Sequence, residues 1–254
     1  MNLGYRLDGP KGAPALALFG SLGSTTNVWE PQLAALAGRA RVVRFDHPGH
    51  GTSPVPDGAV TVDGIATSAL AVLDELEIGR FAVCGLSLGG MVAMWLGANA
   101  PERVGRLVLA CTGAKLGTAE AWSERAELVR REGTVAVAAG VRERWFTPAF
   151  RDSPAAQAVV DELLAIPAGG YARGCEAVGA FDFRHELGRI GQPVLVLAGA
   201  EDPVTPTEVI EPLVSGIRNA AFATIPHAAH LANVEQPDAF TAAVLSHLEE
   251  RAAA

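Results

Sequence analysis

Short apolar runs alternate with longer helical patterns through most of this chain. Six of the runs are rich in β-forming residues and predict buried strands at residues 15–19, 41–45, 81–84, 107–110, 194–198 and 221–225. Apolar strands separated by helices are typical of a parallel sheet that is covered by helices on both faces. Sites in such α/β proteins lie at the carboxyl ends of the strands. We therefore look for chemistry in the loops that follow these runs.

The alternation stops between residues 112 and 190. Glu, Arg and Ala dominate this segment, and no run within it predicts a buried strand. We interpret it as a helical cap inserted into one α/β core that comprises residues 1–111 and 191–254, a size within the range of a single domain. A final amphipathic helix is expected at about 237–250, and the Ala-rich end after Arg251 is expected to fray.

Charge and cysteine content argue against several classes of protein. The formal net charge is −8 and there is no basic run, so we expect no nucleic-acid partner. Cys84, Cys111 and Cys175 form no CxxC pair and have no metal-ligand spacing, which predicts reduced, packed thiols and no metal site. No apolar run is long enough to span a membrane, and the first residues lack the apolar core of a signal peptide. We expect a cytoplasmic protein without membrane contact.

The segment at 81–91, FAVCGLSLGGM, carries the clearest chemical motif. It places Ser87 between Gly85 and Gly89, after a predicted strand and before a predicted helix. A serine is exposed above a sheet only on a sharp strand-to-helix turn, and such a turn leaves no room for side chains at the flanking positions. Ser87 is therefore the candidate nucleophile.

A serine hydroxyl needs a base to take its proton, and the base needs a carboxylate that orients it. Asp202 follows the predicted strand at 194–198 and is the candidate acid, with Glu201 as a neighbouring alternative. His230 follows the last predicted strand and is the candidate base, with His227 as the alternative.

The remaining histidines have simpler interpretations. His47 and His50 lie in DHPGHGTS, which is interpreted as a structural turn, and His185 and His247 are expected to be ordinary cap and surface residues.

Acyl transfer also requires hydrogen-bond donors for the oxyanion that develops on the substrate. The backbone N–H of Leu88, at the start of the predicted helix, is one expected donor. The loop FGSLGS after the strand at 15–19 is expected to supply the second, from either Ser21 or Leu22.

Several segments together resemble the α/β-hydrolase superfamily over nearly the whole chain. They are the serine motif, the loop DHPGHGTS, the turn GAEDPVTP and the segment HLANVEQP, and the order Ser87, Asp202, His230 matches that family. More narrowly, SLGSTTNVWEPQ, APERVGRLVL, RWFTPAF and GYARGCEAV are similar to 3-oxoadipate enol-lactonases, hydrolases of bacterial aromatic degradation. Two departures are a first edge strand that is expected to be short and Pro48 where many members have arginine.

The resemblance implies a cofactor-free reaction. Ser87 would attack the carbonyl of 3-oxoadipate enol-lactone, an acyl-enzyme would form, and water activated by His230 would release 3-oxoadipate. The substrate carries an acetate group, for which the cap should supply a cation. The candidate residues are Arg125, Arg144 and Arg173, with Trp122, Trp145 and Tyr171 as walls or donors, and Arg144 with Trp145 ranks first because both lie in RWFTPAF.

Other activities fit the same residues. A carboxylesterase, another lactonase, a carbon–carbon bond hydrolase or a perhydrolase would use the same serine, and a non-catalytic binding protein is a further alternative because a fold alone does not establish activity. The sequence leaves the oligomeric state open.

Overall fold

A computed structural model of the chain describes residues 1–249 and shows an α/β fold. Seven strands form one sheet in the order β1-β3-β2-β4-β5-β6-β7. The strands are β1 (Tyr5–Asp8), β2 (Ala15–Phe19), β3 (Arg41–Phe45), β4 (Phe81–Leu86), β5 (Val104–Ala110), β6 (Val194–Gly199) and β7 (Ala220–Ile225). Every neighbouring pair is parallel except β1 with β3. The six predicted strands and the mostly parallel sheet are confirmed. The burial expected for 221–225 is wrong, because β7 lies at the second edge of the sheet and only Ile225 in it is buried.

The edge strand β1 was not predicted by any buried run. It has four residues and pairs antiparallel with β3. None of its side chains is buried, and Tyr5 and Leu7 are exposed. Because β1 lies at an edge and its side chains face water, its sequence needs no continuous apolar pattern, and YRLD has none.

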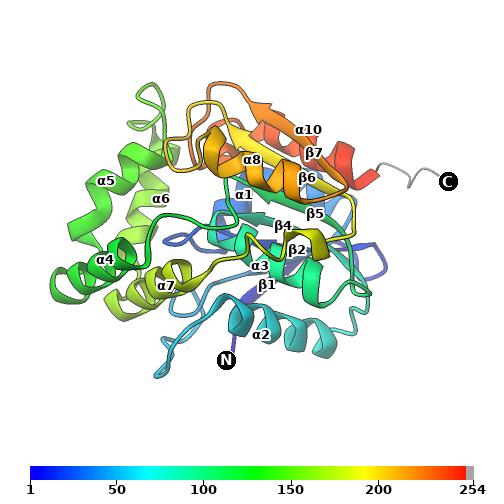
Figure 1. The fold of residues 1–254 in the computed structure, drawn as a ribbon, viewed down its shortest axis with the longest axis horizontal. Coiled ribbons are helices and arrows are strands. Elements are labelled where there is room, and N and C mark those ends of the chain that lie inside the picture. The colour runs from blue at the N-terminus through cyan, green and yellow to red at the C-terminus, as the bar shows by residue number, and fades with distance from the viewer. Residues whose placement is uncertain (250–254) are drawn as a thin grey trace.

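Helices cover both faces of the sheet (Figure 1). They are α1 (Glu30–Ala37), α2 (Val62–Glu75), α3 (Leu88–Asn99), α8 (Thr207–Gly216), α9 (Ala232–Glu235) and α10 (Pro237–Glu249), with 3-10 turns η1 (Thr26–Trp29) and η2 (Leu187–Arg189). The central helix α3 packs on β2, β4 and β5 and against α2, while α1 packs with α10. Most residues of α3 are buried, which fits its nearly continuous apolar sequence.

Four helices fill the chain between β5 and β6, where the alternation of the sequence stops. They are α4 (Ala119–Glu132), α5 (Val135–Trp145), α6 (Pro154–Ala165) and α7 (Ala168–Ala180). They lie together beyond one end of the strands, at the left of Figure 1. We call them the helical insertion. That they act as a cap over a site stays a prediction at this stage.

The last helix corrects one expectation. His247 was expected at the surface, but its side chain is 5% exposed. It lies on the same helix as Phe240, Thr241 and Val244, which are also buried and turn one face of α10 inward. The helix is described to Glu249, and the predicted fraying after Arg251 lies outside the described residues.

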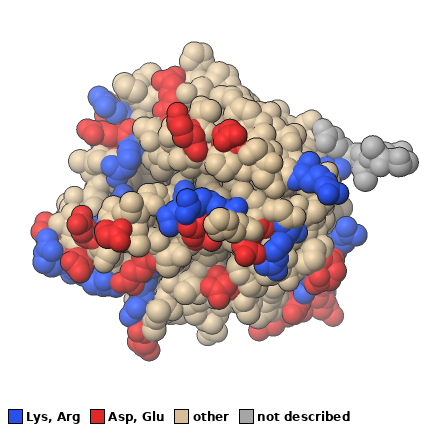
Figure 2. Space-filling view, viewed as in Figure 1, with Lys and Arg blue, Asp and Glu red and all other residues tan. Residues whose placement is uncertain are grey.

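The surface shown in Figure 2 intersperses Lys and Arg with Asp and Glu and has no single large basic area on that face. Among residues 1–249, no helix combines the length and the apolar character needed to cross a membrane.

Candidate active site

The turn from β4 to α3 holds Ser87 in a backbone conformation that residues other than glycine rarely adopt. Its backbone has φ 56° and ψ −113°. Its N–H donates to the Ala110 carbonyl at 2.9 Å, and its carbonyl accepts from Thr112 Oγ1 at 2.7 Å. Both partners belong to the end of β5 and the loop after it, so the neighbouring strand fixes the turn. The side chain is 7% exposed and lies at the carboxyl end of the sheet.

The two glycines of the motif are required by close backbone contacts. A Cβ on Gly85 would lie 2.1 Å from the Gly89 carbonyl oxygen, and a Cβ on Gly89 would lie 2.1 Å from the Phe19 carbonyl oxygen. Both obstacles are backbone atoms, which cannot rotate away as a side chain does. The steric requirement predicted from the motif is therefore present in the structure.

We expect Gly89→Ala to destabilise the fold by about 3 kcal/mol or more, because α3 must move away from β2 to admit the new methyl group. Gly191→Ala is the matched control: no atom lies within 4 Å of a Cβ there, and its φ is not positive. It should change stability by no more than about 0.5 kcal/mol. Urea unfolding measures both, and equal stability of the two variants would contradict the steric account.

Asp202 and His230 come together from loops after β6 and β7. His230 Nδ1 lies 2.9 Å from Asp202 Oδ2, and both side chains are buried. Because a carboxylate only accepts, His230 carries its proton on Nδ1. Asp202 also accepts from the Val204 N–H at 2.8 Å and from Thr205 Oγ1. Burial acts to raise the pKa of Asp202, but His230 and these donors outweigh it and hold the pKa below its usual value.

The alternative residues lie outside this arrangement. Glu201 and His227 approach each other to 3.9 Å, with side chains that are 51% and 86% exposed. They line a different surface depression, next to Pro148 and Phe150. A base that works on a buried serine must share its pocket, so Asp202 and His230 are the better candidates.

One narrow pocket brings together most of the predicted site residues. The α/β core lines one side of this pocket, with Ser21, Leu22, Ser87, Val204 and His230. Its wall from the helical insertion and the loop before it consists of Leu116, Trp122, Arg125, Val141, Arg144, Trp145, Tyr171 and Val178. The insertion thus closes the space above the candidate nucleophile.

The expected oxyanion donors are available on the core side of this pocket. Among the described residues, no backbone or side-chain acceptor takes the N–H of Leu88, Ser21 or Leu22. The Gly89 N–H donates to the Gly20 carbonyl at 3.0 Å, which ties the start of α3 to the loop after β2. Both Ser21 and Leu22 therefore remain candidates for the second donor.

The pocket carries two arginines without a carboxylate partner. Arg125 Nη2 donates to the Tyr171 hydroxyl at 2.5 Å, and its guanidinium lies 5.4 Å from the ring centre of Trp122. Its buried Nε has no hydrogen-bond partner within the part of the chain that the structure describes. Burial, followed by the charge of nearby Arg125, lowers the pKa of Arg144. Within residues 1–249 neither guanidinium lies within 4.0 Å of an Asp or Glu oxygen.

Arg173 is not brought to the pocket. Its guanidinium donates to the Asp57 carbonyl at 2.7 Å in an exposed position. The structure therefore separates it from the other two candidate arginines. Arg173 and Tyr171 both lie on α7, but residues two positions apart in a helix point to different faces of it.

Sequence reasoning missed Glu235, which joins the insertion to the loop of His230. This buried carboxylate accepts from the Ala229 N–H at 2.9 Å, from the Thr147 N–H at 3.2 Å and from Thr147 Oγ1. The Leu231 N–H also donates to the Trp145 carbonyl at 3.0 Å. A Glu five residues after a candidate base is a weak signal, because its partner Thr147 is 88 residues distant in the chain.

A larger, mostly apolar cavity lies at the other end of the strands, next to the first residues of β2, β4 and β5. It contains none of the predicted site residues. We place the candidate site at the smaller pocket, because parallel sheets gather functional groups at the carboxyl ends of their strands. No group of three or more His, Cys, Asp or Glu in the described part of the chain could hold a metal ion, and all three cysteines are free and buried.

The sequence model of the alpha/beta hydrolase family matches residues 20–243. The chain belongs to this family. Among alpha/beta hydrolases, 3-oxoadipate enol-lactonase 2 of Acinetobacter baylyi is 40% identical over 244 residues, which cover 95% of this chain and 91% of that protein. The resemblance inferred from the sequence motifs is thereby confirmed.

Two solved alpha/beta hydrolase structures are close matches over nearly the whole chain. The enol-lactonase from Burkholderia xenovorans LB400 superimposes with a TM-score of 0.94 at 37% identity and covers 98% of this chain and 96% of its own. A hydrolase from Pseudomonas aeruginosa PA01 gives a TM-score of 0.93 at 44% identity, with 98% and 94% covered. Both support the alpha/beta hydrolase fold of the chain.

Proposed function

We propose that this alpha/beta hydrolase opens 3-oxoadipate enol-lactone to 3-oxoadipate through an acyl-enzyme on Ser87. The observation that carries the proposal is the composition of one pocket, in which Ser87 and His230 face Arg125 and Arg144. A serine and a base suit an ester carbonyl, and two unpaired cations suit a carboxylate on the same small molecule. The two similar enol-lactonases support this choice of lactone.

In the first half of the reaction, Ser87 Oγ attacks the lactone carbonyl and its proton passes to His230 Nε2. Asp202 keeps the Nδ1 proton in place and stabilises the imidazolium that forms. The oxyanion accepts hydrogen bonds from the N–H of Leu88 and from that of Ser21 or Leu22. Collapse of the tetrahedral intermediate breaks the ring C–O bond, and His230 returns the proton to the departing enol oxygen, which then ketonises.

In the second half, His230 takes a proton from water, and the hydroxide attacks the acyl carbon. The second tetrahedral intermediate expels Ser87 Oγ, which regains its proton from His230. The product leaves as 3-oxoadipate. Every proton transfer at the ester carbonyl passes through the same imidazole, and the released enol exchanges its O–H proton for a C–H proton with water as it ketonises, so the proposed route uses no metal or organic cofactor.

Arg144 should hold the acetate group of the lactone together with Arg125. Arg125 is fixed against Trp122 and Tyr171, whereas Arg144 is half-buried and its charge is disfavoured beside Arg125. An anion between them would relieve that repulsion and form charge-assisted hydrogen bonds, each worth about 1.5–3 kcal/mol.

Arg144→Gln should therefore raise KM for the enol-lactone by about 10- to 100-fold and leave KM for neutral nitrophenyl acetate within about threefold. Arg173→Gln, which removes an exposed guanidinium outside the pocket, is the matched control and should alter neither value. A rise in KM that is equal for both esters would show that Arg144 shapes the pocket and does not bind the carboxylate.

The proposal as a whole is tested by a spectrophotometric assay on freshly generated enol-lactone, run beside nitrophenyl acetate. We expect kcat/KM for the lactone to exceed that for the neutral ester by at least about 100-fold. A preference for the neutral ester would assign the chain to the carboxylesterases of the same family.

A further inference from the structure

Two loops at the carboxyl edge of the sheet lie directly against each other. One follows β2, spans residues 20–27 and contains both candidates for the second oxyanion donor. The other follows β3 and spans residues 46–53. We call them the oxyanion loop and the support loop. Three side chains of the support loop, Asp46, His47 and His50, hydrogen-bond to backbone atoms of the oxyanion loop.

The part of the oxyanion loop from Gly20 to Gly23, which we call the donor segment, contains Ser21 and Leu22, and His47 binds its amino end. Its Nε2 lies 2.8 Å from the Gly20 carbonyl oxygen, so this nitrogen carries the proton and donates. The same carbonyl accepts from the Gly89 N–H at 3.0 Å, at the start of α3. Gly20 therefore joins the oxyanion loop both to the support loop and to the turn that carries Ser87.

His50 binds the carboxyl end of the donor segment. The Gly23 N–H donates to His50 Nε2 at 3.2 Å, and His50 Nδ1 donates to the Pro48 carbonyl at 3.0 Å. Only an imidazole with its single proton on Nδ1 can do both. The side chain is 1% exposed, and burial lowers its pKa to about 3, so it is neutral throughout the range in which such a hydrolase works.

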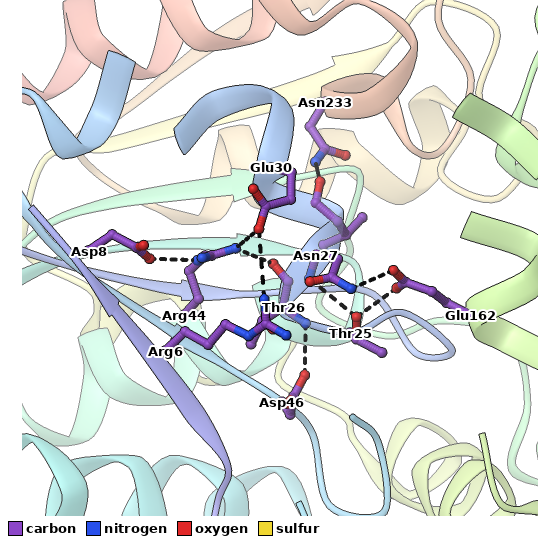
Figure 3. A network of polar contacts seen from close by, with 11 residues as sticks. Arg6, Asp8, Thr25, Thr26, Asn27, Glu30, Arg44, Asp46, Glu162 and Asn233 are labelled. Atoms are coloured by element: carbon purple, nitrogen blue, oxygen red, sulfur yellow. Dashed lines mark hydrogen bonds and ion pairs between the residues drawn. The ribbon is translucent and has the colours of Figure 1, made fainter. Parts of the chain in front are cut away.

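Asp46 binds the oxyanion loop farther along, at Thr26, as the close-up in Figure 3 shows. Its Oδ1 accepts from the Thr26 N–H at 2.7 Å, and its Oδ2 accepts from the Thr52 N–H at 2.9 Å. From the insertion, Glu162 reaches the same loop through Thr25 Oγ1 at 2.6 Å and Asn27 Nδ2 at 2.7 Å. The segment between Gly20 and Gly23 is thus held from both sides, while the N–H groups of Ser21 and Leu22 have no acceptor among residues 1–249 and can donate to a ligand.

We propose that His47 and His50 are positioning residues that set the second oxyanion donor. They bracket Ser21 and Leu22 by holding the carbonyl of Gly20 and the N–H of Gly23. This inference rests on the oxyanion role given to that loop in the proposed function. Oxyanion donors act at about 2.7–3.1 Å, and a displacement of about 1 Å in an active site costs on the order of 100-fold in rate.

Two substitutions of His50 distinguish the roles of its two ring nitrogens. In His50→Gln, the amide oxygen extends to about the place of Nε2 and can still accept from the Gly23 N–H. In His50→Asn, the shorter side chain reaches only the place of Nδ1, so it can still donate to Pro48 but leaves the Gly23 N–H without its acceptor. His185→Asn, at an exposed position outside the pocket, is the control for the same change.

We expect His50→Asn to lower kcat by about 10- to 100-fold for both the enol-lactone and nitrophenyl acetate, with KM within about threefold. The rate at which a fluorophosphonate labels Ser87 should fall by a similar factor, because that reaction also places an oxygen in the oxyanion site. His50→Gln should recover most of the loss, and His185→Asn should behave as the wild type. All rates are measured below the unfolding temperature of each variant.

Equal losses in His50→Asn and His50→Gln, or full activity in His50→Asn, would overturn the proposal. If His50→Asn does not fold, the pair His47→Gln and His47→Asn decides, since only Gln can still donate to the Gly20 carbonyl. If the wild type is labelled rapidly and cleaves the aryl ester but leaves the lactone intact, the proposed substrate is contradicted, whereas the proposed role of the oxyanion loop is not. In that case the labelling rates of the variants still decide the role of His50.

Discussion

Replacing Ser87 with alanine should lower kcat for the enol-lactone by about 10⁴-fold or more. The change removes the atom that forms the acyl bond, and no other hydroxyl takes its place at the turn between β4 and α3. The remaining rate would come from the oxyanion donors and from binding alone. Steady-state assays with enough enzyme to detect single turnovers measure this loss.

The fold and the binding of product should survive this change, because the backbone hydrogen bonds of residue 87 to Ala110 and Thr112 do not involve its side chain. Isothermal titration with 3-oxoadipate tests the second point. Ser123→Ala, at an exposed site on α4, is the control and should be fully active. Turnover by Ser87→Ala within about tenfold of the wild type would place the chemistry elsewhere.

Asp202→Asn should lower kcat by about 10⁴-fold while the protein stays folded. The Asn amide would donate where the carboxylate accepted, so His230 would have to carry its proton on Nε2 and could not take one from Ser87. The Asn oxygen can still accept from the Val204 N–H, which preserves the turn after β6. Circular dichroism and thermal unfolding check the fold beside the kinetics.

Glu201→Gln is the matched control for Asp202→Asn, because it neutralises the adjacent carboxylate that the sequence left as an alternative. Its side chain is half-exposed and faces His227 at the surface, so its activity should stay within about twofold of the wild type. A large loss in Glu201→Gln together with a small loss in Asp202→Asn would reverse the assignment of the acid.

The sequence was sufficient to predict six of the seven strands and the turn at Ser87, because these depend on local patterns. The buried strands need continuous apolar runs, and the turn needs glycine at 85 and 89 to admit the backbone of Gly89 and Phe19. The loops carrying Asp202 and His230 could be located in the same way, since parallel strands place their following loops at one edge.

The predictions were incomplete or stayed open where the position of a side chain depends on contacts between segments that are distant in the sequence. The turn predicted at His47 and His50 is present, but nothing in its local sequence shows that His50 Nε2 meets the Gly23 N–H, 27 residues earlier. Arg125, Arg144 and Arg173 have the same helical surroundings, and only the packing of the insertion shows which of them face the pocket. His247 is buried because α10 packs on the core, whereas its local sequence resembles an exposed helix end.

The most direct test of the account is to find the covalent intermediate. Wild-type protein is mixed with excess enol-lactone, quenched with acid during turnover and digested for mass spectrometry. We predict that the peptide containing Ser87 gains the mass of one lactone molecule, because ring opening adds the whole substrate to the serine, and that Ser87→Ala shows no such peptide. Turnover of the lactone with no adduct on Ser87, or with an adduct on another residue, would contradict the account.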